Sequence, residues 1–387
     1  MKKLKLMIVA GEASGDGHAA KLVRAFRELL PETDLEFFGA AGESLRSEGV
    51  EAVVRSDNLS IVGLAEIGRA LPTFLRAFRA LKRSAIDRKP DVVILVDFPE
   101  FNLKLARVLK KRGLKVIYYI SPQLWAWRKY RIETVRKYVD LVIAILPFEK
   151  EWYAVRGVSH VEYVGSPLAM EVYSTVSKQD FCRVHGLRTD IPIISLLPGS
   201  RHKEITRILP VMLDAALHMA SLDPNIQFVV ASASNRDEAV IQRLVADATE
   251  NNPRLRAAIM VVENETFDAL NASDAAAVAS GTATLEAGII GTPMAVVYKT
   301  SSLNYALFEP IISVEHYGLI NLIAGKRVAK ELIQKAFSAE TLSAELFRLL
   351  EPTVNNSIRD ELKAAADKLG HGGASKRAAE TILRLLG

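Results

Sequence analysis

Short apolar runs alternate with segments of helical periodicity along the chain. In the first half, runs rich in β-branched residues occupy residues 3–10, 35–40, 91–98, 115–121, 140–146 and 161–166. Amphipathic helical patterns lie between some of them, at residues 17–30, 73–86 and 101–113. This alternation predicts βαβ units and a parallel sheet. Because the predicted strands are apolar almost throughout, we expect helices to cover both faces of that sheet.

The same rhythm stops and then begins again in the second half. Residues 166–187 contain no clear strand, and apolar runs return at residues 191–200, 226–234, 257–262, 275–280 and 293–299. A chain of 387 residues is also too long for one ordinary core. We therefore predict an α/β protein with two Rossmann-like domains, at residues 1–166 and 188–360, joined by a linker at 167–187. A helical tail at 361–387 follows, and it can pack back on the first domain.

Composition and charge narrow the function classes. The single cysteine, Cys182, rules out an intramolecular disulfide and fits a reducing compartment, and no Cys/His cluster has the spacing of metal ligands. The formal net charge of +5 suits an anionic partner, which can be nucleic acid, a phosphorylated substrate or an anionic membrane. No nucleic-acid-binding motif is present. No apolar run reaches the roughly 18 residues that a membrane-spanning helix needs, so we interpret the N-terminal run as a strand.

The first predicted strand leads into a turn with the sequence GEASGDG. Ligands of open α/β sheets bind beyond the carboxyl ends of the strands, and this turn lies at such an end. Gly11, Gly15 and Gly17 permit backbone dihedrals closed to other residues and a close approach of a ligand. Ser14 or Asp16 can cap the following helix. The spacing is neither GxGxxG nor a Walker P-loop. The alternative to a ligand site is a tight, capped turn.

Two further strand ends in the first domain carry candidate chemistry. Asp97 lies where the run DVVILVDF ends, before Pro99, and a carboxylate there can act as a general base or only as a turn former or helix cap. The next strand leads into ISPQLWAWRKYR, where Trp125 and Trp127 lie beside Arg128. Indoles can pack a sugar ring or an acyl chain, and an arginine can bind a phosphate. The alternative for this segment is a packed aromatic loop.

Two strand–helix turns in the second domain have features of anion sites. The sequences are LLPGSRHKEI and SGTATLEA, and in each a glycine-containing turn precedes a helix whose free backbone N–H groups favour an anion. The first turn adds a planar, charged guanidinium, and the second is followed one helical turn later by a glutamate that can reach ribose hydroxyls. Each motif alone can be helix capping, but the pair favours a nucleotide diphosphate. The residues are Gly199, Ser200, Arg201, Ser280, Gly281, Thr282 and Glu286.

Together these motifs resemble the lipid A disaccharide synthases, glycosyltransferases of family 19. The resemblance implies the GT-B fold, in which two Rossmann-like domains with parallel sheets face a central cleft. The motifs GEASGD and SPQLWAWR are specific to the family, whereas LPGSR and SGTATLEA are also similar to related UDP-sugar transferases. In family order, the matching stretches are GEASGD, LSIVGLAEI, KPDVVILVDFPEFN, YYISPQLWAWR, LPFEKEWY, LLPGSRHKEI, SGTATLEA and INLIAGKRVAKELIQ, which run from Gly11 to Gln334.

The chain departs from the family pattern at three places. GAAGESL, with Glu43, Ser44 and Leu45, stands where the family has a GGPxM-like stretch. Ser166 precedes Pro167 where many members read VGHP, and GLIN replaces SLPN. These departures concern the acceptor side more than the reaction.

The resemblance implies a reaction and a cellular place. The donor would be UDP-2,3-diacylglucosamine and the acceptor 2,3-diacylglucosamine 1-phosphate. Inverting transfer would give a β-1,6-linked tetraacyl disaccharide 1-phosphate and UDP in lipid A (lipopolysaccharide) biosynthesis. The first domain would bind the acceptor and the second the UDP-sugar, with no cofactor or metal. The enzyme would be cytoplasmic and peripherally associated with the inner membrane, and its oligomeric state stays open.

On this hypothesis each candidate residue has a role. Asp97 is the general base, with Glu12 or Asp16 as the alternative acid. Arg201, Ser200 and the turn at 280–282 stabilise the leaving diphosphate, and Glu286 holds the ribose. The substrate-binding candidates are Gly11, Ser14, Gly15, Trp125, Trp127, Arg128, Asn321 and Glu331, of which the last two match family positions without an assigned role. The alternatives are another GT-B UDP-sugar enzyme (an N-acetylglucosamine transferase or epimerase) and a non-catalytic UDP-sugar-binding protein.

A basic amphipathic segment at residues 58–89 predicts a membrane contact. Phe74, Leu75, Phe78 and Leu81 recur at helical spacing among several basic residues. Such a helix can lie in a bilayer interface, with its cations near anionic headgroups. The alternative is a crossover helix whose apolar face packs on the sheet. Because the implied substrates carry acyl chains, we expect Phe74 and Phe78 to face the membrane.

Overall fold

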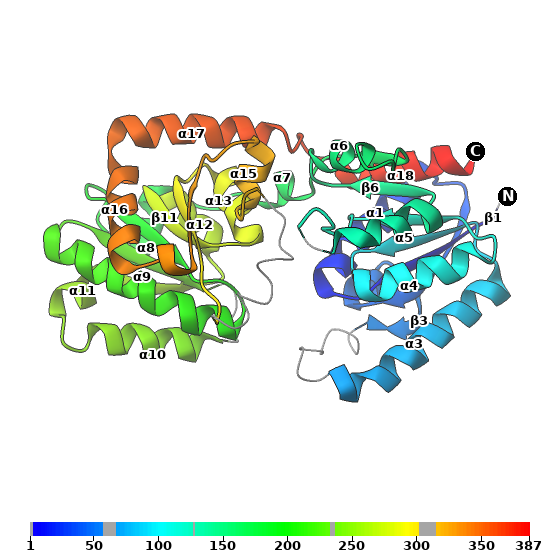
Figure 1. Cartoon of the computed structure of the whole chain (residues 1–387), viewed down its shortest axis with the longest axis horizontal. Coiled ribbons are helices and arrows are strands. Elements are labelled where there is room, and N and C mark those ends of the chain that lie inside the picture. Colours follow the sequence, from blue (N-terminus) through cyan, green and yellow to red (C-terminus); the bar gives the residue numbers. More distant parts are fainter. Residues whose placement is uncertain (1–2, 57–66, 127, 233–236, 302–314) are drawn as a thin grey trace. The chain divides into compact units, whose positions relative to one another are not determined.

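Figure 1 shows the computed structural model, which describes residues 3–56, 67–126, 128–232, 237–301 and 315–387. The chain divides into two compact units, residues 1–167 with 371–387 and residues 168–370. Each unit contains one parallel sheet with helices between its strands, as the alternating pattern predicts.

The first unit has a seven-stranded sheet in the order β3-β2-β1-β4-β5-β6-β7. The strands are β1 (Lys3–Ala10), β2 (Asp34–Ala41), β3 (Glu51–Arg55), β4 (Val92–Val96), β5 (Val116–Tyr119), β6 (Leu141–Ala144) and β7 (Val161–Tyr163). The helices are α1 (Ala13–Leu29), α2 (Glu43–Ser47), α3 (Ile67–Arg88), α4 (Pro99–Lys110), the short 3-10 helix η2 (Lys129–Arg131), α5 (Ile132–Tyr138), α6 (Glu149–Ala154) and α18 (Ala374–Leu386).

Helices cover both faces of this sheet and create two apolar cores. On one face α1 packs against α18, and Phe26 and Ile382 share a core with Ile8 of β1. On the other face α3 and α4 pack, and Leu105 shares a core with Val93 of β4. In Figure 1, α18 (red) lies among the elements of the first unit although it ends the chain. Burial on both faces explains why these strands are almost continuously apolar.

The second unit has a six-stranded parallel sheet in the order β10-β9-β8-β11-β12-β13. Its strands are β8 (Ile193–Leu197), β9 (Gln227–Ser232), β10 (Ile259–Glu263), β11 (Ala275–Ala279), β12 (Met294–Tyr298) and β13 (Lys330–Ile333). Its helices are α7 (Leu168–Glu171), α8 (Lys178–His185), α9 (His202–Leu222), α10 (Glu238–Thr249), α11 (Pro253–Ala258), α12 (Thr266–Ala272), α13 (Thr282–Ile290), α15 (Leu319–Ala324), the 3-10 helix η4 (Gln334–Ala336), α16 (Ala339–Leu350) and α17 (Pro352–Asp367).

The segment predicted as a linker, residues 167–187, carries structure of its own. Helix α8 packs against α12, and Asp268 of α12 accepts hydrogen bonds from the backbone N–H of Thr175 (2.6 Å) and the hydroxyl of Ser174 (2.8 Å). Residues from 168 onward therefore belong to the second unit. The predicted tail is divided, because α17 belongs to the second unit and α18 to the first.

The first six strands of each unit follow the same order in the sheet, and this order determines where a ligand can bind. In each sheet the first strand of the unit lies beside the fourth, at β1–β4 and at β8–β11. From that pair the sequence order runs outward in opposite directions. Such a reversal is a topological switch point, where the loops beyond the carboxyl ends of two strands separate and leave room for a ligand.

Helix α3 does not turn its phenylalanines outward, so the prediction for Phe74 and Phe78 is wrong. Both side chains pack against the core of the first unit, where the ring of Phe74 lies 5.9 Å from Phe98 and that of Phe78 lies 5.6 Å from Phe101. Leu75, on the outer face, is 44% exposed. The alternative of a crossover helix packed on the sheet is therefore correct for this part of α3.

Helix α9 is the one helix, among the described residues, that is long and apolar enough to cross a membrane. Half of its most apolar window is buried inside the second unit, where α9 packs against α10 and α16. The buried side chains include Ile208, Met212 and Met219, which recur at helical spacing. This one-sided burial is the pattern of a core helix beside a sheet.

Candidate active site

The switch point of the first unit brings Gly11 and Glu12 beside Asp97. Ala10, the last residue of β1, pairs with Val96, the last residue of β4. The residues that follow these strands therefore lie next to each other. The backbone of Gly15 also lies here, since a Cβ added to it would be 3.9 Å from the Cβ of Asp97.

The first turn is shorter than the sequence indicated, because α1 begins at Ala13. Glu12 is its N-cap residue and is exposed, whereas Ser14, Gly15 and Gly17 are already helical. The prediction that the glycines supply unusual dihedrals is wrong, since none of those in this turn has a positive φ. Gly11 is required for a different reason: a Cβ there would overlap the ring of Phe98.

Asp16 is an anchor of the neighbouring loop. Its side chain is buried and accepts hydrogen bonds from the backbone N–H groups of Gly42 (2.6 Å), Ser44 (2.8 Å) and Leu45 (3.3 Å). These contacts satisfy the free N–H groups at the start of α2. A carboxylate engaged in this way is a poor general base, so the geometry favours Asp97 and Glu12 over Asp16.

Asp97 is partly buried and its carboxyl is electrostatically unusual. Burial and, to a smaller extent, the nearby Glu12 carboxylate raise the pKa of Asp97 to about 6, against the opposing effect of the backbone N–H of Phe98. Asp97 and Phe98 both adopt left-handed backbone conformations, with φ of 45° and 49°. Each such conformation costs a non-glycine residue on the order of 1–3 kcal/mol, and strain of this kind clusters at functional sites.

The tryptophan loop that follows β5 is mostly packed inward. Trp125 is 6% exposed, and its indole N–H donates to Glu149 (3.2 Å). Arg128 pairs with Glu100 of α4, and Arg131 pairs with the same carboxylate at 2.6 Å. Trp125 thus follows the alternative of a packed aromatic loop and does not offer its face to a substrate. Trp127 lies outside the described residues.

Sequence reasoning missed Glu149, which holds this loop. Its carboxylate is fully buried and also accepts the backbone N–H of Leu146 (3.1 Å). Burial raises the pKa of Glu149 to about 7, while these hydrogen bonds oppose the shift. The signal was the family motif LPFEKEWY, in which Glu149 directly follows three apolar residues.

The switch point of the second unit brings its two glycine-containing turns together. Gly199 has a φ of 108°, which favours glycine, and a Cβ there would lie 3.6 Å from the Cβ of Ala279 at the end of β11. Arg201 is the N-cap residue of α9; its side chain is exposed and 3.1 Å from Glu204. Ser200 is also exposed. The starts of α9 and α13 therefore lie at one edge of the sheet, with their N–H groups available for an anion.

The turn at 280–282 combines an exposed end with internal contacts. The Ser280 hydroxyl donates to the carbonyl of Tyr317 (2.8 Å), so it fixes the turn. Gly281 is the N-cap residue of α13, and Thr282 begins the helix with an exposed side chain. Glu286 is partly buried, and burial alone raises its pKa. Among the described residues its carboxylate accepts no hydrogen bond, so it is available to water or to a ligand.

Asn321 and Glu331 form a supporting network beside this turn. Asn321 is fully buried and donates to the carbonyl of Ala329 (2.7 Å) and to Glu331 (2.9 Å). Its carbonyl oxygen accepts from the backbone N–H of Val328 (2.9 Å). The same Glu331 oxygen accepts from the N–H of Gly318 (2.8 Å). These contacts give Asn321 a structural role, and among the described residues no hydrogen bond reaches the second oxygen of Glu331.

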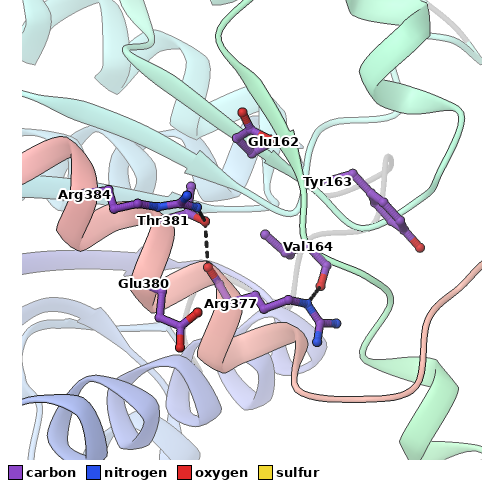
Figure 2. A pocket seen from close by; sticks show the side chains of 7 residues that line it. All are labelled: Glu162, Tyr163, Val164, Arg377, Glu380, Thr381 and Arg384. Carbon is purple, nitrogen blue, oxygen red and sulfur yellow. Dashed lines mark hydrogen bonds between the residues drawn. The ribbon is translucent and has the colours of Figure 1, made fainter.

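A separate cavity lies in the first unit, between the end of β7 and α18 (Figure 2). Its volume is about 440 Å³, and Arg377 donates across it to the carbonyl of Val164 (2.7 Å). None of the residues predicted for the site lines it. We therefore place the candidate chemistry at the two switch points. The lining residues are Glu162, Tyr163, Val164, Arg377, Glu380, Thr381 and Arg384.

Comparison with known proteins agrees with this geometry. A lipid-A-disaccharide synthase of Syntrophus aciditrophicus (strain SB) is 44% identical over 387 residues, which cover 100% of this chain and 99% of that protein. The S. aureus MnaA–UDP co-structure is similar with a TM-score of 0.65 and 14% identity, covering 100% of this chain and 97% of that one. The kitacinnamycin glycotransferase structure has a TM-score of 0.64 and 15% identity, covering 99% of both chains. The fold is thus that of GT-B glycosyltransferases.

A family model gives the final assignment. The model described as Lipid-A-disaccharide synthetase matches residues 6–384, which include both switch points. The chain therefore belongs to the lipid-A-disaccharide synthetase family.

Proposed function

We propose that this chain transfers the diacylglucosaminyl group of UDP-2,3-diacylglucosamine to the 6-hydroxyl of 2,3-diacylglucosamine 1-phosphate. The product is a β-1,6-linked tetraacyl disaccharide 1-phosphate, and UDP is released. The observation that carries the proposal, beyond family membership, is the partly buried Asp97 carboxylate at one switch point, in a chain whose other switch point has the features of a diphosphate site. Membership in the lipid-A-disaccharide synthetase family does not favour the alternatives, which are an N-acetylglucosamine transferase or epimerase and a non-catalytic UDP-sugar-binding protein.

Asp97 is the proposed general base. Its ionised carboxylate accepts the proton of the acceptor hydroxyl as the oxygen attacks the anomeric carbon. The new C–O bond forms on the face opposite the breaking bond to the diphosphate, so the configuration is inverted. A pKa raised to about 6 makes this carboxylate a stronger base than an ordinary aspartate, while it remains ionised near neutral pH.

The turns of the second unit are the proposed diphosphate site. Charge develops on the leaving UDP, and the N–H groups at the starts of α9 and α13 can stabilise it. Arg201 contributes a planar, permanently charged fork, and the Glu286 carboxylate accepts from ribose hydroxyls. In this proposal, protein groups stabilise the charge that develops on the leaving UDP, and no metal ion takes part.

An anionic membrane surface is the proposed source of the acylated substrates. The outer face of α3 exposes Leu75 together with Arg76, Arg79 and Arg83. A basic helix face with a small apolar component binds anionic headgroups through its cations and adds shallow apolar contact. The proposal therefore places peripheral association at the outer face of α3 and keeps Phe74 in the core.

The test is to supply the purified chain with both acylated sugars and to follow UDP release and product mass. We expect UDP and a tetraacyl disaccharide 1-phosphate in equal amounts. A matched acceptor that lacks the 6-hydroxyl should give no disaccharide, because no nucleophile is present. Release of UDP with free diacylglucosamine, or isomerisation of the donor sugar, would contradict the proposal.

A further inference from the structure

The backbone around Asp97 is held in a conformation that needs outside support. Asp97 and Phe98 are consecutive non-glycine residues with positive φ, at the end of β4 and the start of α4. Residues other than glycine rarely adopt this region, and they keep it only where the surroundings impose it. The position of the Asp97 carboxylate therefore depends on the contacts that hold the backbone of Asp97 and Phe98.

Two buried side chains converge on the carbonyl oxygen of Asp97. The hydroxyl of Tyr118, on the adjacent strand β5, donates to it at 2.6 Å. The amide of Asn102, on α4, donates to it at 2.8 Å and to the carbonyl of Val96 at 3.1 Å. Tyr118 and Asn102 are both fully buried, so the two donor groups are shielded from solvent.

The ring of Phe98 holds the second half of the turn. It lies over Gly11, where any Cβ would overlap it, and its centroid is 5.5 Å from Phe101 and 5.9 Å from Phe74. A turn held through its carbonyl on one side and its ring on the other leaves the Asp97 side chain few orientations.

We infer that Tyr118 and Asn102 are positioning residues for the proposed base, because they hold the Asp97 carbonyl and thereby fix where its carboxylate lies. This inference rests on the proposed function. The titratable groups whose charges act on Asp97 or Tyr118 are Glu12 at the start of α1, Glu100 on α4, Arg131 on η2 and Tyr153 on α6.

Tyr118→Phe is the variant that tests the inference. It removes one hydroxyl and keeps the ring, so the core stays filled. We expect kcat to fall about 10- to 100-fold, with KM for the UDP-sugar unchanged, because a small misplacement of a reacting group has a cost of this size. The acid limb of the kcat/KM profile should move to lower pH, since a loosened turn lets water reach the Asp97 carboxylate.

Tyr119→Phe is the matched control. Tyr119 is the next residue of β5, equally buried, but its side chain belongs to the core on the opposite face of the sheet. Removal of its hydroxyl should leave kcat and the acid limb where they are in the wild type. Equal effects of the two variants would show a general loss of packing and would overturn the inference.

A second measurement needs no substrate. The carboxyl titration of Asp97, followed by NMR in the free protein, should occur at lower pH in Tyr118→Phe than in the wild type. Asn102→Ala should shift it in the same direction, which keeps the test available if Tyr118→Phe does not fold. An unchanged titration in both variants would overturn the inference. A wild type that makes no disaccharide would instead overturn the proposed function, and the titration would still decide the positioning role.

Discussion

The two units have the same strand order at their switch points and opposite chemistry there. At β1–β4 the edge carries acids, of which Asp97 is partly buried beside Glu12. At β8–β11 the edge carries the starts of α9 and α13, the exposed side chain of Arg201, and Gly199, whose φ is 108°. One edge raises the pKa of a carboxylate, and the other concentrates positive partial charge.

This difference indicates how one architecture supplies two halves of a transfer reaction. A base needs a carboxylate that is poorly solvated, and the crowded turn around Phe98 provides this. A leaving group needs donors that are already oriented, and backbone N–H groups at helix starts provide these without reorganisation. The strand order fixes where the site lies, whereas a few residues decide which chemistry it supports.

The largest expected effect comes from the first switch point. Asp97→Asn should lower turnover by about 10²- to 10⁴-fold, the usual loss for a general base, and leave the UDP dissociation constant unchanged. Steady-state assays and calorimetric titration with UDP measure the two quantities. Near-normal turnover would remove Asp97 from the mechanism, and a comparable loss in Glu12→Gln alone would transfer the role to Glu12.

The pH dependence of the wild type sharpens the same prediction. Because the pKa of Asp97 is raised to about 6, the carboxylate is ionised above that pH, and kcat/KM should fall as the pH drops through it. Glu12→Gln removes a negative charge that raises this pKa, so its acid limb should lie at lower pH than in the wild type. If the acid limb of kcat/KM lies at the same pH in Glu12→Gln as in the wild type, the titration belongs to a group other than Asp97.

The next effect comes from the second switch point. Arg201→Lys should weaken UDP binding about tenfold, because lysine keeps the charge but loses the paired planar contact. The acid limb should stay in place, since Arg201 belongs to the other unit. Arg254→Lys is the control: Arg254 is exposed on α11, which precedes β10 and so lies at the opposite edge of the sheet. An unchanged dissociation constant for Arg201→Lys would place Arg201 outside the nucleotide site.

Periodicity predicted the two sheets because most strands are buried on both faces. It missed β3 and β13, two of the four edge strands, since each begins with a charged residue and is only partly buried. It found Asp97 and the two glycine-containing turns because strand ends are visible in the sequence. It could not show that Asp16 binds the loop at 42–45, because that contact joins residues 26 or more positions apart.

The directions of side chains were harder to predict than the elements themselves. Phe74 and Trp125 are aromatic residues beside basic ones, and this pattern fits a membrane or a ligand as well as a core. The contact with Phe98 sets the direction of Phe74, and the hydrogen bond to Glu149 sets that of Trp125. Both partners are distant in the sequence. Tyr118 and Asn102 gave no signal, because their importance depends on one backbone carbonyl whose geometry the sequence does not reveal.

The smallest expected effect concerns membrane binding, which we propose for the first unit and not for the second. Arg79 on the outer face of α3 is exposed, and a basic residue near an anionic surface contributes about 1 kcal/mol, or roughly fivefold in affinity. Arg79→Gln should therefore weaken binding to vesicles of anionic lipid by about that factor, and added salt should reduce the difference because it screens the charge.

Arg254→Gln in the second unit is the control, because it removes the same charge and should leave vesicle binding unchanged. Equal losses in the two variants would show that net charge alone governs binding. No loss in Arg79→Gln would remove the outer face of α3 from the membrane contact, and the buried packing of α9 argues against that helix as a replacement.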